Sequence, residues 1–156
     1  MEIEEILKLH TKWVIDTAPI IYYIEENPAY LHVVDKIFSR LISHNGESVF
    51  AFSSIVTLTE VLTHPLRHND QELASRYRRF LLKSHNFTLF HVDESIAERA
   101  AAIRARYNYR TPDAIQLATG VENHATLFIT NDIRLKNFSD LTVIVLDDFI
   151  SKTNMP

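Results

Sequence analysis

Glycine is scarce in this sequence, and its scarcity excludes several kinds of nucleotide-binding protein. Only Gly46 and Gly120 occur among the 156 residues. A P-loop or a GxGxxG turn needs several glycines, because the backbone must approach phosphates closely there. The chain contains neither motif, so neither a nucleoside triphosphate nor a dinucleotide is expected as a cofactor.

Cysteine is absent, and so are long hydrophobic runs. Without cysteine there is no disulfide framework and no thiolate metal site, and a reducing, cytoplasmic setting is expected. No apolar run approaches the roughly 20 residues that a membrane span needs, and no leader pattern opens the chain, so no membrane partner is expected. The formal net charge of −4 argues against wholesale electrostatic binding of nucleic acid, but it permits a local basic groove.

What the sequence does contain is a regular alternation of short apolar runs and helical periodicities. Its length suits one domain, since roughly 68–70% of the unfolded surface can be buried at that size. Buried strands are predicted at 12–17, 48–53, 87–92, 125–130 and 141–146. Helices are predicted at 18–27, 28–45, 54–64, 70–84, 93–107 and from Thr111 onward. This alternation predicts an α/β fold with a mainly parallel central sheet flanked by helices on both faces.

The chain is expected to divide into three parts. Residues 1–12 are predicted to form a short amphipathic N-terminal arm, residues 13–150 the α/β domain, and residues 151–156 a tail. Gly46 is expected to end the helix that begins near residue 28, because glycine is the residue that most often follows a helix.

Four acids follow strands or begin helices at places that should meet. Asp16 ends the first strand, Asp132 follows the strand at 125–130, and Asp113 comes just inside a helix start. Glu60 is the only charged residue between residues 49 and 63. Reactive groups of parallel sheets gather beyond the carboxyl ends of the strands, so these acids can converge on one edge.

Such a cluster needs neutralisation, because neighbouring carboxylates disfavour joint ionisation. A carboxylate site without cysteine suits Mg²⁺ or Mn²⁺. Each acid alone also has a structural interpretation. Asp16 can cap a helix, Asp113 can interact with a helix dipole, and Asp132 can belong to a turn. Glu60 is the hardest to explain in this way, since a lone charge on an apolar helix is rarely buried without a partner.

Four motifs together resemble those of a known family. They are "VIDTAPIIYYI" (14–24), "SIVTLTEVL" (54–62), "TPDAIQLATG" (111–120) and "LFITNDIRL" (127–135). Their order and spacing are similar to those of the PIN-domain nucleases, particularly the toxins of VapBC-type toxin–antitoxin pairs. The resemblance extends from about Trp13 to Asp148.

The resemblance implies a fold, a metal site and partners. In that family the motif acids bind Mg²⁺ or Mn²⁺ and cleave RNA, and the matching positions here are Asp16, Glu60, Asp113 and Asp132. Thr130 matches a position that supplies a hydroxyl close to the acids. The resemblance also implies a homodimer and a cognate antitoxin whose tail blocks the acidic groove. Tyr and Phe side chains of residues 20–42 are either contact points or part of the core.

Several positions depart from the family pattern. Ala18 stands where the family often has Asn or Ser, and Gly120 stands where it usually has Ala. The acid often found shortly after the last motif is absent, and Arg134 and Lys136 occupy that neighbourhood. These departures predict a site that binds one ion well and a second ion poorly.

Basic residues flank the acidic motifs. Arg110 precedes Asp113, while Arg134 and Lys136 follow Asp132. They form either an ion-paired, solvated surface or a rim that contacts RNA phosphates. Both interpretations stay open from the sequence.

The eight histidines predict no zinc site. His64 and His68 have helical i,i+4 spacing, but Pro65 and the polar residues after it predict a turn. No HExxH motif or comparable set occurs. Structural or surface roles are expected.

The function predicted from these features is metal-dependent hydrolysis of RNA by a toxin of a toxin–antitoxin pair. A PIN-type nuclease of RNA maturation or decay fits the same residues. A receiver-like signalling domain that binds Mg²⁺ is a further alternative, although "SVFAFSS" (48–54) ends in serine where that class needs a phosphoacceptor Asp. A catalytically silent binding protein is the last alternative.

Overall fold

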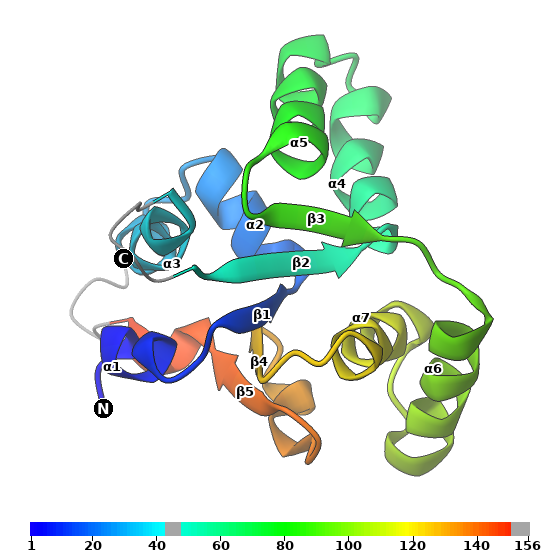
Figure 1. The fold of residues 1–156 in the computed structure, drawn as a ribbon. Coiled ribbons are helices and arrows are strands. Elements are labelled where there is room, and N and C mark those ends of the chain that lie inside the picture. The colour runs from blue at the N-terminus through cyan, green and yellow to red at the C-terminus, as the bar shows by residue number, and fades with distance from the viewer. Residues whose placement is uncertain (43–47, 151–156) are drawn as a thin grey trace.

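One parallel sheet organises the chain (Figure 1). The computed structural model describes residues 1–42 and 48–150. Within them, five strands lie in the order β3-β2-β1-β4-β5, and all neighbouring strands pair in parallel. The strands are β1 (Lys12–Ile15), β2 (Phe50–Ser54), β3 (Phe87–Phe90), β4 (Leu127–Thr130) and β5 (Thr142–Val145). The predicted α/β fold is confirmed.

Helices cover both faces of the sheet. In the described ranges they are α1 (Ile3–Lys8), α2 (Thr17–Ile24), α3 (Leu31–Ile42), α4 (Val56–Arg67), α5 (Gln71–Lys83), α6 (Glu94–Tyr107) and α7 (Thr111–Glu122). Successive side chains of a strand point to opposite faces. Trp13 and Ile15 therefore pack in one core with α1 to α5, whereas Val14 packs in the other with α6 and α7. Burial on both faces explains why the strands are continuous apolar runs in the sequence.

The N-terminal arm is docked on the domain. Ile3 and Leu7 of α1 are buried in the same core as Trp13, and the side chains of Glu2 and Glu5 form a capping box at the start of the helix. The predicted amphipathic pattern therefore corresponds to a packed helix. The tail proposed for residues 151–156 lies outside the described residues. No helix in the described part of the chain is long and apolar enough to cross a membrane.

The helix that carries Glu60 is longer than the sequence predicted. The turn expected from Pro65 and the polar residues after it begins only at His68, because α4 continues to Arg67 and the backbone N–H of His68 donates to the carbonyl of His64. Pro65 is buried in the last part of the helix. A proline there removes one backbone hydrogen bond, and the burial of its ring offsets that loss.

The end of α3 and the turns after β4 and β5 also differ from the prediction. Ile42, the last residue of α3, was expected on the buried stripe of that helix but is 65% exposed. The helix stop expected at Gly46 lies outside the described residues. Two short 3₁₀ turns, η1 (Ile133–Asn137) and η2 (Leu146–Phe149), follow β4 and β5. The apolar pattern did not predict them, since each is only about one turn long.

Helix α7 lies close to the sheet at Gly120. A Cβ atom at this position would be 2.7 Å from Cγ2 of Val14 and 3.0 Å from Cδ1 of Leu141. Both neighbours are buried and have little room to move. The missing side chain therefore permits the close approach of the helix that carries Asp113.

Candidate active site

Asp16 stands where the central strand ends. It is the N-cap residue of α2, and its Oδ1 accepts a 2.8 Å hydrogen bond from the backbone N–H of Thr17. Its Oδ2 accepts a 2.7 Å bond from the hydroxyl of Thr130. The backbone N–H of Asp16 donates to the carbonyl of Ile129 at 2.9 Å, which extends the pairing of β1 with β4. Strand pairing thus brings Asp16 and Thr130 together.

The carboxyl group of Asp16 is held in an unfavourable electrostatic environment. Burial raises its pKa to about 6, while the hydrogen bonds from Thr130 and Thr17 act in the opposite direction. The negative charges of Asp113 and Glu60 raise the pKa further. A cation among these groups would relieve the repulsion that Asp16 experiences.

Glu60 approaches the same place from α4. Glu60 is exposed, and it is therefore not the buried charge that the apolar helix suggested. Its Oε1 nevertheless accepts a 3.0 Å hydrogen bond from the hydroxyl of Thr17. Partial loss of water raises the pKa of Glu60, the bond from Thr17 lowers it, and the charge of Asp113 raises it. Glu60 therefore lies at the outer side of the acidic cluster.

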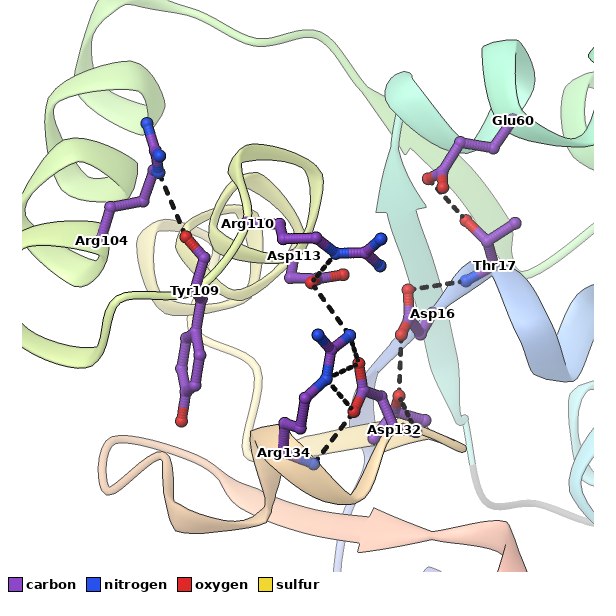
Figure 2. Close-up of polar contacts among 10 residues, drawn as sticks. Asp16, Thr17, Glu60, Arg104, Tyr109, Arg110, Asp113, Asp132 and Arg134 are labelled. Atoms are coloured by element: carbon purple, nitrogen blue, oxygen red, sulfur yellow. Dashed lines mark hydrogen bonds and ion pairs between the residues drawn. The ribbon is translucent and has the colours of Figure 1, made fainter.

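Asp113 does not cap its helix. The N-cap position of α7 is Arg110, and Asp113 is buried in the first turn, 9% exposed. Its Oδ2 lies 3.3 Å from Nε of Arg110 and 4.0 Å from a terminal guanidinium nitrogen of Arg134. The carboxylate thus has arginine partners and is oriented toward Asp16 rather than toward the backbone of α7 (Figure 2).

Asp132 is bound by Arg134. Nε of Arg134 donates to both carboxylate oxygens, at 2.9 and 3.0 Å, and the guanidinium makes a further bond to Oδ2. This guanidinium lowers the pKa of Asp132. The backbone N–H of Asp132 donates at 3.0 Å to the hydroxyl of Thr130, which connects Asp132 to Asp16 through one side chain.

All four predicted acids line one open depression of about 460 Å³, which we call the acidic hollow. Thr130, Arg110 and Arg134 line it as well. Its complete lining is Asp16, Thr17, Ala18, Ile21, Tyr22, Glu60, Arg110, Asp113, Thr130, Asn131, Asp132, Ile133 and Arg134. Lys136 is not part of it, and its ammonium group instead pairs with Asp148 at 2.6 Å.

A set of polar residues behind the acids was not predicted. Gln116 accepts a 2.9 Å hydrogen bond from the backbone of Ser54 and donates to the hydroxyl of Thr57. Thr57 in turn lies 3.2 Å from the hydroxyl of Thr17, which holds Glu60. This chain of hydrogen bonds joins α7, β2, α4 and α2. The sequence signal that could have indicated this network is Gln116, a polar residue between two apolar residues of a largely buried helix.

The donors of the acidic hollow fit a hard divalent cation. Carboxylate and hydroxyl oxygens are the ligands that Mg²⁺ and Mn²⁺ prefer, and such ions usually keep several waters. Within residues 1–42 and 48–150, no three His, Cys, Asp or Glu side chains form a compact group that could hold a metal ion, and Thr17, Thr130 and Arg134 bind the carboxylates. Ala18 contributes no donor. The fit therefore rests on the chemistry of the donors.

Asp16 follows β1 and Asp132 follows β4, so both lie at the carboxyl edge of the parallel sheet, where α/β domains bind their ligands. The chain belongs to the PIN domain family, a family of nucleases, and the family model matches residues 13–141. The resemblance drawn from the motifs is thereby confirmed. No curated protein sequence matches the chain.

Solved structures with the same fold come from toxin–antitoxin complexes. The complex from Klebsiella pneumoniae has a TM-score of 0.61 and 20% identity, over 85% of this chain and 96% of that one. VapBC2 from Rickettsia felis, bound to a DNA fragment from its promoter, has a TM-score of 0.67 and 14% identity, over 86% and 98%. DNA-bound VapBC from Salmonella typhimurium gives 0.56 and 16%, over 86% and 98%. At these identities the likeness concerns the fold.

Proposed function

We propose that the protein is a ribonuclease that hydrolyses RNA phosphodiester bonds with Mg²⁺ or Mn²⁺ at the acidic hollow. The observation that carries the proposal is the electrostatics of Asp16, whose pKa is raised by burial and by the nearby charges of Asp113 and Glu60. Acids from four separate elements converge on this hollow, although the ionised form of each carboxylate would be more stable in water, away from the other acids. A cation-binding role accounts for their convergence.

Each residue has a definite task in this chemistry. We assign direct metal contact to Asp16 and Asp113, and direct or water-mediated contact to Glu60 and Asp132. A bound Mg²⁺ or Mn²⁺ supplies an activated water and stabilises charge on the phosphate and the leaving oxygen. Thr130 fixes the orientation of the Asp16 carboxylate through its 2.7 Å bond. No histidine base is needed, and none lines the acidic hollow.

We further propose that one cation suffices. The guanidinium of Arg134 binds Asp132 and lies 4.0 Å from Asp113, so it provides a fixed positive charge on that side of the hollow. Arg134 also lies in the region where the family often carries an additional acid. A second ion would have to compete with this guanidinium.

The partners proposed for the chain are RNA, a cognate antitoxin and a second copy of itself. The three solved complexes all contain an antitoxin by name or as part of VapBC, which supports a role as the toxin of a type II toxin–antitoxin system. For the antitoxin we propose the apolar hollow of about 460 Å³ between α3 and α5, which the half-buried Tyr23 and Phe80 help to line. Tyr23 lies within residues 20–42, whereas Phe38 in that range belongs to the core.

The strand order argues against one alternative function, a receiver-like domain, but does not separate the toxin from other PIN-type nucleases. A receiver-like domain has the strand order 2-1-3-4-5, which differs from the order found here. A PIN-type nuclease of RNA maturation or decay would use the same acidic hollow. A gene for a small antitoxin next to the gene for this protein would favour the toxin.

The experiment that tests the proposal is cleavage of RNA by the purified protein. Wild type should cut RNA in Mg²⁺ or Mn²⁺ and stop when EDTA is added, and Asp16→Asn should be inactive in both conditions. Full activity in EDTA would contradict the proposal. So would the absence of cleavage by wild type over a varied set of single-stranded and structured RNAs.

A further inference from the structure

A second hollow adjoins the acidic hollow. It has a volume of about 330 Å³, at the lower end of the range of small-molecule sites. Its lining is Tyr107, Asn108, Tyr109, Arg110, Asp113, Arg134, Leu135 and Asn137, and we call it the tyrosine hollow. Arg110, Asp113 and Arg134 line both hollows. Figure 2 shows Tyr109 on the side of Arg134 that faces away from Asp16.

Two stacked tyrosine rings form one wall of the tyrosine hollow. The rings of Tyr107 and Tyr109 lie 5.1 Å apart and within 11° of parallel. Asn108 between them has a left-handed conformation, with φ of 58°, which ends α6 and turns the chain. The hydroxyl of Tyr107 bonds to that of Ser139 at 2.9 Å, and its ring packs against Phe138. The wall is therefore fixed before any ligand binds.

The hydroxyl of Tyr109 is buried without a hydrogen-bond partner in the described part of the chain. An unsatisfied buried hydroxyl destabilises a fold, so each such group calls for an explanation. Burial raises the pKa of Tyr109, and the hydroxyl therefore remains a neutral donor. Because the hydroxyl is buried, a ligand in the tyrosine hollow meets the ring of Tyr109 and not its hydroxyl.

Two exposed guanidinium groups stand between the tyrosine hollow and the acids. The side chains of Arg110 and Arg134 are 68% and 59% exposed, although each contacts a carboxylate. A guanidinium has five N–H donors, so both retain donors for a second anion. The planar fork of a guanidinium matches the geometry of phosphate as well as that of carboxylate.

We propose that the tyrosine hollow binds one unpaired nucleotide of the RNA next to the phosphodiester that is cleaved. Its base packs on the wall formed by Tyr107 and Tyr109, and Arg110 and Arg134 contact the adjoining phosphates. Aromatic walls accept any base, because every base has a π face, but they require a base that is not paired in a helix. The inference rests on the proposed function, and it restricts the substrate to single-stranded RNA at this position.

The test measures RNA binding in EDTA, where no cleavage is expected, by fluorescence anisotropy. The probes are a short mixed-sequence single-stranded RNA and the same RNA with abasic spacers in place of every base, because a wall that accepts any base does not fix one register. For wild type, loss of the bases should raise Kd roughly 5- to 100-fold, although the phosphates remain. This comparison requires no variant of the protein.

Variants of Tyr109 then assign the effect to its ring. Tyr109→Leu should weaken binding of the intact RNA by a similar factor and should lose the sensitivity to the spacers. Tyr109→Phe keeps the ring and should retain most of the binding. Phe149→Leu is the matched control, because Phe149 is a half-buried aromatic residue that lines none of the three hollows, and it should bind RNA as wild type does.

The outcomes separate this inference from the proposed function. If the abasic RNA binds as tightly as the intact RNA, or Tyr109→Leu binds like wild type, the nucleotide site is overturned, while metal-dependent cleavage by wild type still supports the ribonuclease. If wild type neither binds nor cuts any RNA, the proposed function fails together with the nucleotide site.

Discussion

The hydroxyl of Thr130 donates a 2.7 Å hydrogen bond to Asp16 across the ends of two paired strands. The same oxygen accepts a 3.0 Å bond from the backbone of Asp132. One buried hydroxyl thus positions two of the acids. Substitutions of Thr130 can separate the contribution of this hydroxyl to stability from that of the side-chain volume.

Thr130→Val removes the hydroxyl and nearly conserves the volume. We expect the free energy of unfolding to fall by about 1–3 kcal/mol, because the backbone N–H of Asp132 loses its acceptor. The pKa of Asp16 should rise further, since the bond from Thr130 lowers it. Urea unfolding and carboxyl-carbon NMR titration measure the two effects. Thr130→Ser keeps the hydroxyl, and identical behaviour of the two variants would contradict the assignment.

Asp16 gives the metal-free protein a pH dependence of defined sign. Its pKa is about 6 in the folded chain and ordinarily 3.8, so the folded state binds more protons than the unfolded state between these values. Stability should therefore decrease as the pH rises from about 4 to about 6. Asp16→Asn lacks this loss and should be more stable than wild type above pH 6, by about 1–3 kcal/mol.

The measurement is denaturant unfolding of both proteins in EDTA across the pH range. The advantage of Asp16→Asn should disappear below about pH 4, where Asp16 is protonated in both states. A difference that stays constant with pH would show that the charge of Asp16 is not its cause.

Arg110 and Arg134 should contribute to the salt dependence of RNA binding. Replacing either with Ala removes a phosphate contact, and the slope of log K against log salt should become shallower by about 0.7 for single-stranded RNA. Lys136→Ala is the matched control, because Lys136 pairs with Asp148 outside the acidic hollow. Equal slopes for Arg134→Ala and Lys136→Ala would show that Arg134 does not contact RNA phosphates and belongs to an ion-paired surface.

Gly120→Ala should destabilise the protein. The new methyl group would lie 2.7 Å from Val14, and such overpacking costs about 1–3 kcal/mol, while the better helix propensity of alanine recovers up to about 1 kcal/mol. Thermal unfolding measures the net loss. Val14→Ala should relieve part of it, so that the two substitutions are not additive. A Gly120→Ala variant as stable as wild type would refute the close approach of α7.

Much of the fold could be predicted because the sheet is buried on both faces. Strands such as β1 and β4 are unbroken apolar runs, and the helices between them keep an apolar stripe. The error at Pro65 arose because the sequence pattern does not show tertiary burial, which holds the proline inside α4. Local pattern also failed to predict the exposure of Ile42.

The convergence of the acids could be predicted, because the carboxyl ends of the strands in a parallel sheet meet at one edge. The residues that bind these acids could not be predicted. Arg134 is close enough to Asp132 in the sequence for an ion pair, but its second contact, with Asp113, depends on the packing of η1 against α7. The bond between Gln116 and Thr57 joins residues 59 positions apart, and only the packed fold brings them together. The stacked rings of Tyr107 and Tyr109 were missed for another reason, because the left-handed turn at Asn108 that brings them together leaves no apolar pattern in the sequence.

The central claim is that Asp113 belongs to a cation site together with Asp16, Glu60 and Asp132, and the most direct test is calorimetric titration with Mn²⁺. Wild type should bind Mn²⁺, and Asp113→Asn should bind it at least about 10-fold more weakly. Asp35→Asn, which removes an exposed acid of α3, should bind Mn²⁺ like wild type. Equal Mn²⁺ affinity in wild type and Asp113→Asn would contradict the account and leave Asp113 as a structural partner of Arg110.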